Sequence, residues 1–381
     1  MTLKLYENDS YIKEFSATVL SCEAVGKHYA VILDKTAFFA EGGGQDADKG
    51  EINGIEVIDV QEREEDIIHT LAVPLNKGDI VNGKIDWALR FSRMQNHCAE
   101  HILSGVIHKM FGYNNVGFHM NDSLITFDVD GPLTAKDIEQ VEIEANKAVF
   151  QNAEISVSYP TLEDFETIEC RSKIELVDGV RLITVDGFDT CACCAPHPSF
   201  AGEIGIIKIV NFSAFKGGTR IEMVAGTLAL KDYSYLHNAS KTIMKQLSAK
   251  REEIAEQVAK LGEDLATAKA EIKALNEKLA EAELETKIIG NTLIGFTKNA
   301  DFNTLRNIAN GKIDTAEYIA LFAETEEGFN YLVASKNGDT RGYAKALNEN
   351  FSGKGGGRPD CVQGKIAKTE EKSLITIFQN S

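Results

Sequence analysis

Four residues in two short stretches have the types and spacing to bind one metal ion. His97 and His101 are four residues apart, and Cys193 and His197 repeat that spacing later in the chain. On a helix, residues four apart share a face with their Cβ atoms about 6 Å apart, so both imidazoles can reach one ion. Three imidazoles and a thiolate make a complete tetrahedral set, which is typical of zinc. We therefore predict Zn²⁺ bound by these four side chains.

The neighbouring cysteines leave one alternative open. Cys191 and Cys194 flank Cys193 and compete with it as the sulfur ligand. The chain has 7 cysteines, an odd number, and three of them fall within four positions. This pattern indicates reduced thiols and a metal rather than a disulfide framework, so we expect a cytoplasmic protein.

Two helices are predicted around the first histidine pair and after it. The first begins at an N-cap, Asp86, and runs to Met110, with Gly112 just past its end. The second follows Thr134 and ends near Asn152. Strands are then expected at four places: Ile155 to Ser158, Val180 to Val185, Ile204 to Phe212 and Thr219 to Ala225.

The N-terminal residues are rich in strand patterns. Short apolar runs alternate with Gly, Asn and Asp turns, which predicts a small β-barrel: Ala17 to Leu20, Tyr29 to Leu33, Glu56 to Val60, and Ile67 to Leu71. The stretch Thr36 to Gln45 contains three consecutive glycines. Glycine permits positive φ and close approach to a ligand, although a tight loop between strands explains the same residues.

The C-terminal half changes pattern twice. From about Leu236 to Leu284, apolar residues recur every three or four positions with Lys and Glu between them. This predicts a coiled coil, or a helical hairpin turning near Gly262. Residues 290–381 return to an α/β pattern and contain a glycine-rich loop from Gly353 to Asp360.

These patterns predict an α+β multidomain chain. The expected parts are a small N-terminal β-barrel with the glycine motif (1–86), an α/β zinc-containing domain (87–232), a coiled-coil or hairpin segment (233–288) and a C-terminal α/β globular domain (289–381). A single core rarely grows beyond roughly 250–300 residues, so several domains are expected in a chain of 381 residues.

The charge of −18 argues against general binding of nucleic acid, but charge is unevenly distributed. The stretch 341–368 has a basic excess, and its candidates for RNA contacts are Arg341, Lys345, Lys354 and Arg358. The chain has no apolar run long enough to span a membrane, and its first residues do not resemble a secretory signal.

Several of these motifs together resemble one known family. The His97/His101 and Cys193/His197 pairs are similar to the metal site of alanyl-tRNA synthetase editing domains and of their freestanding AlaX-type relatives. The Thr36 to Gln45 stretch is similar to the family signature Thr-x-Phe-Tyr-x-x-Gly-Gly-Gln, and Arg93 to His97 resembles the approach to the editing helix. Arg220 to Gly226 resembles the closing strands of that domain.

The chain departs from the family in two places. Cys193-Cys194-Ala195-Pro196-His197 stands where the family usually has Cys-Gly-Gly-Thr-His, and only Cys193 has the family spacing. The Gly353 to Asp360 loop resembles the family's C-terminal domain, but Cys361-Val362-Gln363 replaces Met-Ala-Gln after it.

The resemblance implies a trans-editing enzyme. Such a protein hydrolyses the ester of tRNA(Ala) mischarged with serine or glycine, depends on zinc, and lacks aminoacylation activity, for which no domain is recognised here. The implied pocket contains Thr36, Gly43, Gly44 and Gln45, with the Thr36 hydroxyl recognising the serine hydroxyl. His119 is a further, weaker candidate. The helical segment or the C-terminal domain is expected to form a homodimer, and no membrane is involved.

Other functions remain open from the sequence. A zinc-dependent peptidase or amidase is one, although Glu100 directly precedes the second histidine instead of following the first as in His-Glu-x-x-His enzymes. A noncatalytic tRNA-binding protein with a structural zinc is another, because four protein ligands describe a closed site. Zinc could activate water, polarise the ester, or position the substrate amine, and the last is our preferred interpretation.

Overall fold

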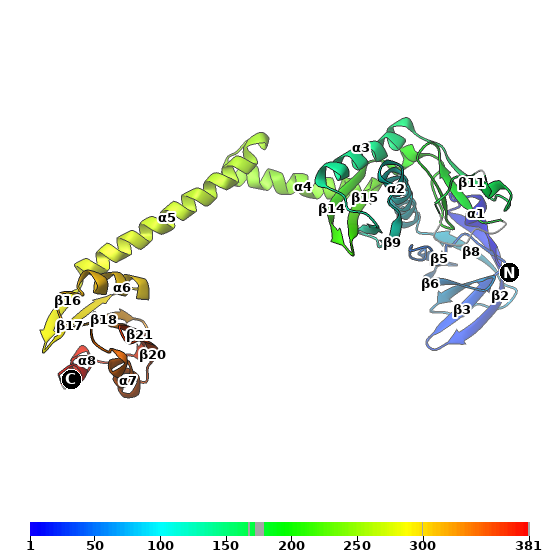
Figure 1. Cartoon of the computed structure of the whole chain (residues 1–381). Coiled ribbons are helices and arrows are strands. Elements are labelled where there is room, and N and C mark those ends of the chain that lie inside the picture. Colours follow the sequence, from blue (N-terminus) through cyan, green and yellow to red (C-terminus); the bar gives the residue numbers. More distant parts are fainter. Residues whose placement is uncertain (167, 172–178, 299, 380–381) are drawn as a thin grey trace. The chain divides into compact units, whose positions relative to one another are not determined.

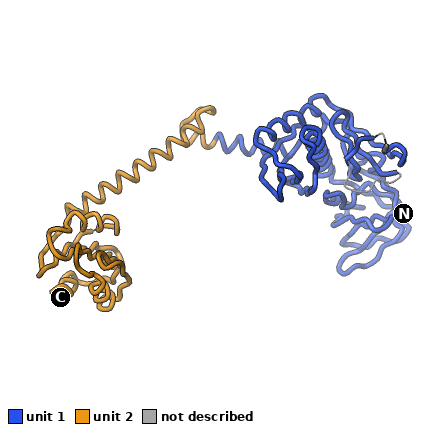
Figure 2. Tube along the Cα trace, in the orientation of Figure 1, with its two compact units in different colours: residues 1–241 blue, residues 242–381 orange. Residues whose placement is uncertain are grey.

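The structure is a computed structural model of the 381-residue chain that describes residues 1–166, 168–171, 179–298 and 300–379 (Figure 1). It divides into two compact units, Met1–Lys241 and Thr242–Ser381 (Figure 2). No helix in these described ranges is long and apolar enough to cross a membrane.

The first unit begins with a closed six-stranded barrel in the order β2-β3-β7-β6-β5-β8. All neighbouring strands are antiparallel, and their inward side chains, such as Val31, Ile52 and Leu71, are fully buried. The barrel strands are β2 (Glu14–Val25), β3 (His28–Leu33), β5 (Gly50–Ile52), β6 (Ile55–Arg63), β7 (Asp66–Leu71) and β8 (Ile80–Ile85). The sequence predicted this barrel but not the short β5 or the polar β8.

Three short elements flank the first two barrel strands. Strand β1 (Leu3–Lys4) and helix α1 (Leu5–Asn8) precede β2, and β4 (Lys35–Thr36) follows β3. Strand β1 pairs in parallel with β4, and α1 lies next to it in the sequence. The Thr36 to Gln45 stretch therefore begins at the last residue of β4 and continues into the irregular segment 37–49 that precedes β5.

The central helix α2 (Trp87–Phe111) begins and ends as its sequence indicates. The Asp86 side chain accepts a hydrogen bond from the Leu89 amide at 3.1 Å, and Gly112 takes the left-handed conformation with φ of 75°. Helix α3 (Ala135–Gln151) has a capping box at Thr134 and ends at Asn152 with φ of 52°. Both predicted helices are confirmed.

Two sheets surround these helices. One has the order β14-β15-β10-β9, and the other is β11-β12-β13. Helix α2 packs against α3, β10, β13 and β15, so it is buried on nearly all sides (Figure 1). The strands are β9 (Asn115–Met120), β10 (Ile125–Val129), β11 (Ile155–Ser158), β12 (Leu182–Val185), β13 (Asp189–Ala192), β14 (Ile207–Phe215) and β15 (Gly218–Ala225). Two single-turn 3-10 helices, η1 (Asp164–Glu166) and η2 (Ala201–Ile204), occupy the connections.

The helical segment is interrupted earlier than predicted. Helix α4 (Gly226–Leu247) ends before Ser248, which has φ of 52°, and η3 (Arg251–Glu253) leads into α5 (Ile254–Ala282). Gly262 lies inside α5, so the predicted turn there is wrong. A single glycine costs a helix only about 1 kcal/mol relative to alanine, which the flanking residues offset.

After α5, the described residues of the second unit form a six-stranded sheet and three further helices. Its strand order is β16-β17-β18-β19-β21-β20, in which only β17 and β18 are parallel. The elements are β16 (Glu285–Ile289), β17 (Thr292–Lys298), α6 (Phe302–Gly311), β18 (Tyr318–Thr325), β19 (Gly328–Ser335), α7 (Arg341–Asn350), β20 (Lys354–Arg358), β21 (Cys361–Ala367) and α8 (Glu371–Ile377).

The predicted glycine-rich loop from Gly353 to Asp360 is instead mostly an edge strand. Residues Lys354–Arg358 form β20, which pairs with β21. A Cβ at Gly355 would lie 2.4 Å from the Tyr331 hydroxyl oxygen, so glycine allows a close approach here rather than a turn.

The mixed α/β character with several sheets is confirmed, and the division into four domains stays a prediction.

Candidate metal centre

The two histidines of α2 lie side by side in the interior of the first unit. The rings of His97 and His101 stack with centroids 5.2 Å apart, and each residue is only 3% exposed. Their spacing on one face of a capped, buried helix fixes this pairing, as the sequence predicted.

The second pair approaches from the segment that follows β13. Cys193 Sγ lies 3.6 Å from His97 Nε2 and 3.4 Å from His197 Nε2. The His197 ring centroid is 4.9 Å from that of His101. One ligand atom from each of His97, His101, Cys193 and His197 falls within 4.8 Å of the others. The structure thus brings together all four residues that the sequence singled out.

The electrostatics at Cys193 and His197 favour the protonation states that bind metal. Burial alone would raise the pKa of the Cys193 thiol, but His97 and His197 outweigh it and hold that pKa well below its usual value. Burial lowers the pKa of His197 to about 3, so this imidazole is neutral. Burial alone would lower the pKa of His101, but its hydrogen bonds to Asp189, Cys191 and Cys193 outweigh burial and raise that pKa well above its usual value. A metal ion bound here would therefore displace a proton from His101, and the thiolate and imidazoles would then form a donor set that suits zinc.

Hydrogen bonds behind the rings orient two of the imidazoles. His97 Nδ1 donates to Gln45 Oε1 at 2.8 Å, and His101 Nδ1 donates to Asp189 Oδ2 at 3.3 Å. Arg171 fixes Asp189 through two further bonds of 2.7 and 2.8 Å. These contacts leave both Nε2 atoms directed toward Cys193, which is how ligand histidines are usually held.

A second possible ligand group shares His101 with Asp189 and Cys191. Arg171 already occupies both carboxylate oxygens of Asp189, so this group has less free donor capacity than the first. Cys194 is exposed, and its sulfur lies beside Gly42 and Gly43 rather than among the imidazoles. The four-residue group is therefore the better metal site.

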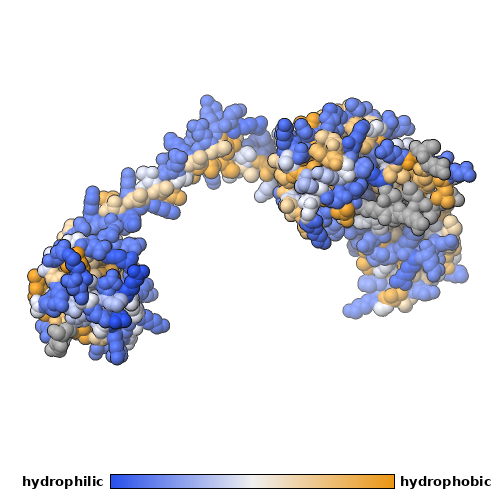
Figure 3. Space-filling model, viewed as in Figure 1, coloured by the Kyte–Doolittle hydropathy of each residue, from blue (hydrophilic) through white to orange (hydrophobic). Residues whose placement is uncertain are grey.

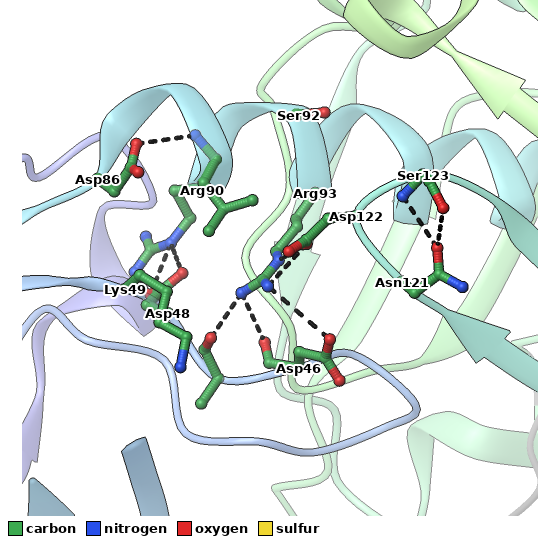
Figure 4. A network of polar contacts seen from close by, with 12 residues as sticks. Asp46, Asp48, Lys49, Asp86, Arg90, Ser92, Arg93, Asn121, Asp122 and Ser123 are labelled. Atoms are coloured by element: carbon green, nitrogen blue, oxygen red, sulfur yellow. Dashed lines mark hydrogen bonds and ion pairs between the residues drawn. The ribbon is translucent and has the colours of Figure 1, made fainter. Parts of the chain in front are cut away.

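The glycine motif is fixed to α2 by two arginines (Figure 4). Arg90 is fully buried, and its guanidinium pairs with Asp48 and donates to the Ala37 carbonyl. Arg93 donates to the Ala47 carbonyl and pairs with Asp122 at 2.7 Å. Because both arginines precede His97 on the same helix, they hold the loop that carries Gln45 in register with the metal ligands.

Within this loop, glycine is required by conformation. Gly43 and Gly44 have φ of 59° and 82°, and a Cβ on Gly44 would lie 2.5 Å from the Phe118 ring. The Phe118 ring in turn packs on His97 with centroids 5.0 Å apart. The loop therefore closes one wall of the site.

A cavity of about 390 Å³ opens next to the four candidate metal ligands. Its walls include Gly43, Phe118 and Arg181, together with His97, His101 and Cys193. Its size suits a small ligand or the end of a larger one.

The described residues that line the cavity do not include four of the residues predicted for the pocket: Thr36, Gly44, Gln45 and His119. Thr36 is buried in the barrel, where its hydroxyl donates to His69 Nε2 at 2.8 Å, and it is not among the residues that line the cavity. His119 is exposed on β9, because side chains alternate along a strand and its neighbour Phe118 faces the cavity. Gln45 supports His97 from behind rather than lining the cavity.

The cavity also contains residues that the sequence did not single out. Glu100 and Asn115 line it, and both belong to a hydrogen-bonded group with Ser104. The i, i+4 spacing of Glu100 and Ser104 next to His101 was the available signal, but polar residues on a helix are usually exposed.

The predicted tRNA contacts all lie on the surface of the second unit. Arg341 pairs with Asp339 at 2.6 Å, and Lys345 lies 3.9 Å from Glu349. Lys354 and Arg358 are exposed on β20. Arg358 also lines a cavity of about 690 Å³ with Arg306 and Lys336.

Two families of sequences match the first unit where the barrel and the site lie. The family of class II (A) tRNA synthetases matches residues 9–89, and the second additional domain of threonyl and alanyl tRNA synthetases matches residues 180–222, which include Cys193 and His197. The chain thus resembles the editing parts of tRNA synthetases.

Individual relatives extend this similarity over nearly the full chain. The alanyl-tRNA editing protein Aarsd1 of Rattus norvegicus is 26% identical, covering 97% of this chain and 96% of that protein. Aarsd1-B of Xenopus laevis is 27% identical, covering 98% and 96%. The alanine–tRNA ligase of Ignicoccus hospitalis is 31% identical over 74% of this chain but only 32% of the ligase. The resemblance to freestanding alanyl-tRNA editing proteins is confirmed.

Proposed function

We propose that this protein is a zinc-dependent trans-editing hydrolase that releases serine or glycine from mischarged tRNA(Ala) and does not itself charge tRNA. The observation that carries the proposal is the buried group of His97, His101, Cys193 and His197 beside a cavity, in a chain similar to alanyl-tRNA editing proteins along nearly its whole length. We expect it to work in the cytoplasm.

Three imidazoles and the Cys193 thiolate would hold the zinc ion. When bound, zinc can polarise an ester carbonyl or supply a more acidic water. Gln45 and Asp189 orient the imidazoles of His97 and His101 through hydrogen bonds. Phe118 forms one wall of the cavity. The cavity then encloses the aminoacyl end, as productive ester hydrolysis requires.

A structural zinc in a noncatalytic tRNA-binding protein is the second candidate. One observation favours it: four protein ligands leave no open position, whereas catalytic zinc normally has one. The two candidates differ in whether ester release occurs at all.

The second unit is proposed to hold the tRNA body, and α5 to join two copies of the chain. Lys354 and Arg358 are exposed cations on a strand whose glycines allow close approach. Along α5, apolar side chains at heptad spacing are about half exposed (Figure 3): Val258, Leu261, Leu265, Ile272, Leu275 and Leu279.

The test is single-turnover deacylation of seryl- and glycyl-tRNA(Ala) by the zinc-loaded protein. We expect release that is abolished by a chelator and by His101→Ala, but kept by His119→Ala, which changes an exposed histidine outside the cavity. Tight tRNA binding without ester release would favour the structural-zinc candidate. Cleavage of peptides with no effect on tRNA would contradict both.

A further inference from the structure

Glu100 has an unusual position in the cavity. It lies on α2 directly before His101, is only 5% exposed, and is the only carboxylate among the described residues that line the cavity. Its Oε1 accepts hydrogen bonds from the Ser104 hydroxyl and the Asn115 amide. Asn115 is fixed in turn, because its Oδ1 accepts from the Gly117 amide at 3.0 Å. The carboxyl group is therefore held in one orientation.

Glu100 forms no direct ion pair in the described part of the chain, although it interacts electrostatically with Arg171, which lines the same cavity. Both of its donors are neutral, and no described Lys, Arg or His nitrogen forms an ion pair with it. The two cavity arginines are engaged elsewhere: Arg171 pairs with Asp189, and Arg181 donates to the carbonyls of Cys193 and Ala195 at 2.9 and 2.8 Å. A buried carboxylate with no cation in direct contact is unfavourable, so a cationic ligand bound to it would stabilise it.

The substrate of the proposed function carries such a cation. An aminoacyl ester has a free α-ammonium group next to the ester carbon. A metal with four protein ligands has no open position for that amine, so the amine needs another partner. Glu100 Oε2 takes no hydrogen bond from any described residue, and Glu100 lines the same cavity as three of the metal ligands.

We propose that Glu100 is the residue that binds the α-ammonium group of the aminoacyl end, and so restricts the cavity to esters of amino acids with a free amine. This inference rests on the proposed function, since it assigns a residue to the same site. In this assignment Glu100, and not the metal, binds the substrate amine. Aminoacyl ends with a blocked amine are then poor ligands.

The test compares two probes that cannot be hydrolysed. One is the serine amide of 3′-amino-3′-deoxyadenosine, and the other is the same compound with an N-acetylated serine. Their dissociation constants are measured calorimetrically with the full zinc-loaded chain. We expect wild-type protein to prefer the free amine by about 10- to 100-fold, the range for a hydrogen-bonded charge pair.

Glu100→Gln keeps the shape and removes the charge. It should weaken binding of the free-amine probe by that same factor and leave the acetylated probe unchanged. Ser104→Ala removes one hydrogen bond to Glu100. It should reduce the preference for the free-amine probe over the acetylated probe, but by a smaller factor than Glu100→Gln. The matched control is Glu169→Gln, at an exposed glutamate that lines a different cavity, and it should behave as wild type.

The outcomes separate this inference from the proposed function. Equal loss of both probes in Glu100→Gln, with zinc content retained, would overturn the ammonium assignment and indicate a structural or water-binding role. Equal binding of both probes by wild type would also overturn it, even if deacylation occurs. Failure of wild type to release either serine or glycine from tRNA(Ala) would reject the proposed function, and the inference with it.

Discussion

The chain contains two triplets of glycine, and comparing them shows how the same composition serves two purposes. Gly42–Gly44 turns through left-handed conformations, with φ of 59° and 82° at Gly43 and Gly44. Gly355–Gly357 lies in the extended strand β20, and none of its glycines has positive φ. The first triplet needs glycine for its backbone angles, and the second mainly for the space that a side chain would fill.

The two triplets also differ in what holds them. The first is attached to α2 by buried charges, so that Gln45 meets His97 at a fixed distance. The second is held by pairing with β21 and leaves its side chains exposed. A rigid, buried loop suits the orientation of a metal ligand, whereas an exposed edge with nearby cations suits contact with a large polyanion.

The largest expected effect comes from breaking the buried charge pair of the first loop. Asp48→Ala leaves the fully buried Arg90 guanidinium without its carboxylate, which should lower the free energy of unfolding by about 3–5 kcal/mol. Urea denaturation measures this. Asp46→Ala, at a half-exposed neighbour, is the control and should cost less than about 1 kcal/mol. If Asp48→Ala also cost less than about 1 kcal/mol, the buried Arg90–Asp48 pair would not be what fixes the loop to α2.

A second prediction concerns pH, because the first triplet follows the buried Thr36–His69 contact. Burial lowers the pKa of His69 to about 4, while an unfolded histidine titrates near 6.5. Between these values only the unfolded chain binds the proton, so stability is full above about pH 6.5 and is lost toward pH 4, by about 3 kcal/mol at most. His69→Gln in metal-free protein should remove this part of the acid sensitivity. If the difference between the urea midpoints at pH 7 and pH 4.5 were the same in His69→Gln as in wild type, the assigned role of His69 would be contradicted.

Matched substitutions in the two triplets test the comparison itself. Gly44→Ala forces a Cβ into positive φ and against Phe118, so we expect a loss of about 1–3 kcal/mol and weaker zinc binding. Gly356→Ala places a Cβ in open space on an extended strand, so stability should change by less than about 0.5 kcal/mol. Thermal unfolding of both variants decides whether the two triplets differ as described.

The smallest effect on stability is expected at the cations beside the second triplet. Arg358→Ala should leave the unfolding free energy nearly unchanged but weaken tRNA binding and lower the salt slope by about 1, since one phosphate contact is lost. Arg341→Ala is the control, because Asp339 already pairs with that guanidinium. Equal salt slopes for wild type and Arg358→Ala would remove β20 from the proposed tRNA surface.

The grouping of the four candidate metal ligands could be predicted because local spacing alone brings each pair together. His97 and His101 need only a helix, and Asp86 and Gly112 define its ends in the sequence. The contact between the two pairs is long-range, so local spacing does not predict it. The types of the four side chains do, because a cysteine and three histidines at such spacing are typical of a metal site.

The positions of the other predicted pocket residues depend on packing that spacing does not reveal. The family resemblance predicts Thr36 in the pocket, but its hydroxyl is hydrogen-bonded to His69 on the barrel strand β7. His119 and Phe118 are neighbours on β9, and a shift of one residue decides which faces the cavity. The place of Glu100 in the cavity cannot be predicted from the sequence, because its burial depends on the elements that pack around α2. The turn of the helical segment was likewise set at Ser248 rather than at the glycine.

The most direct test of the metal centre is the zinc content of the purified protein and of two serine variants. We predict one zinc per chain in wild type, loss of zinc in Cys193→Ser, and full retention in Cys194→Ser, because only the Cys193 sulfur lies among the three imidazoles. Zinc retained by Cys193→Ser, or lost equally in both variants, would contradict the assignment of these four residues as the metal site.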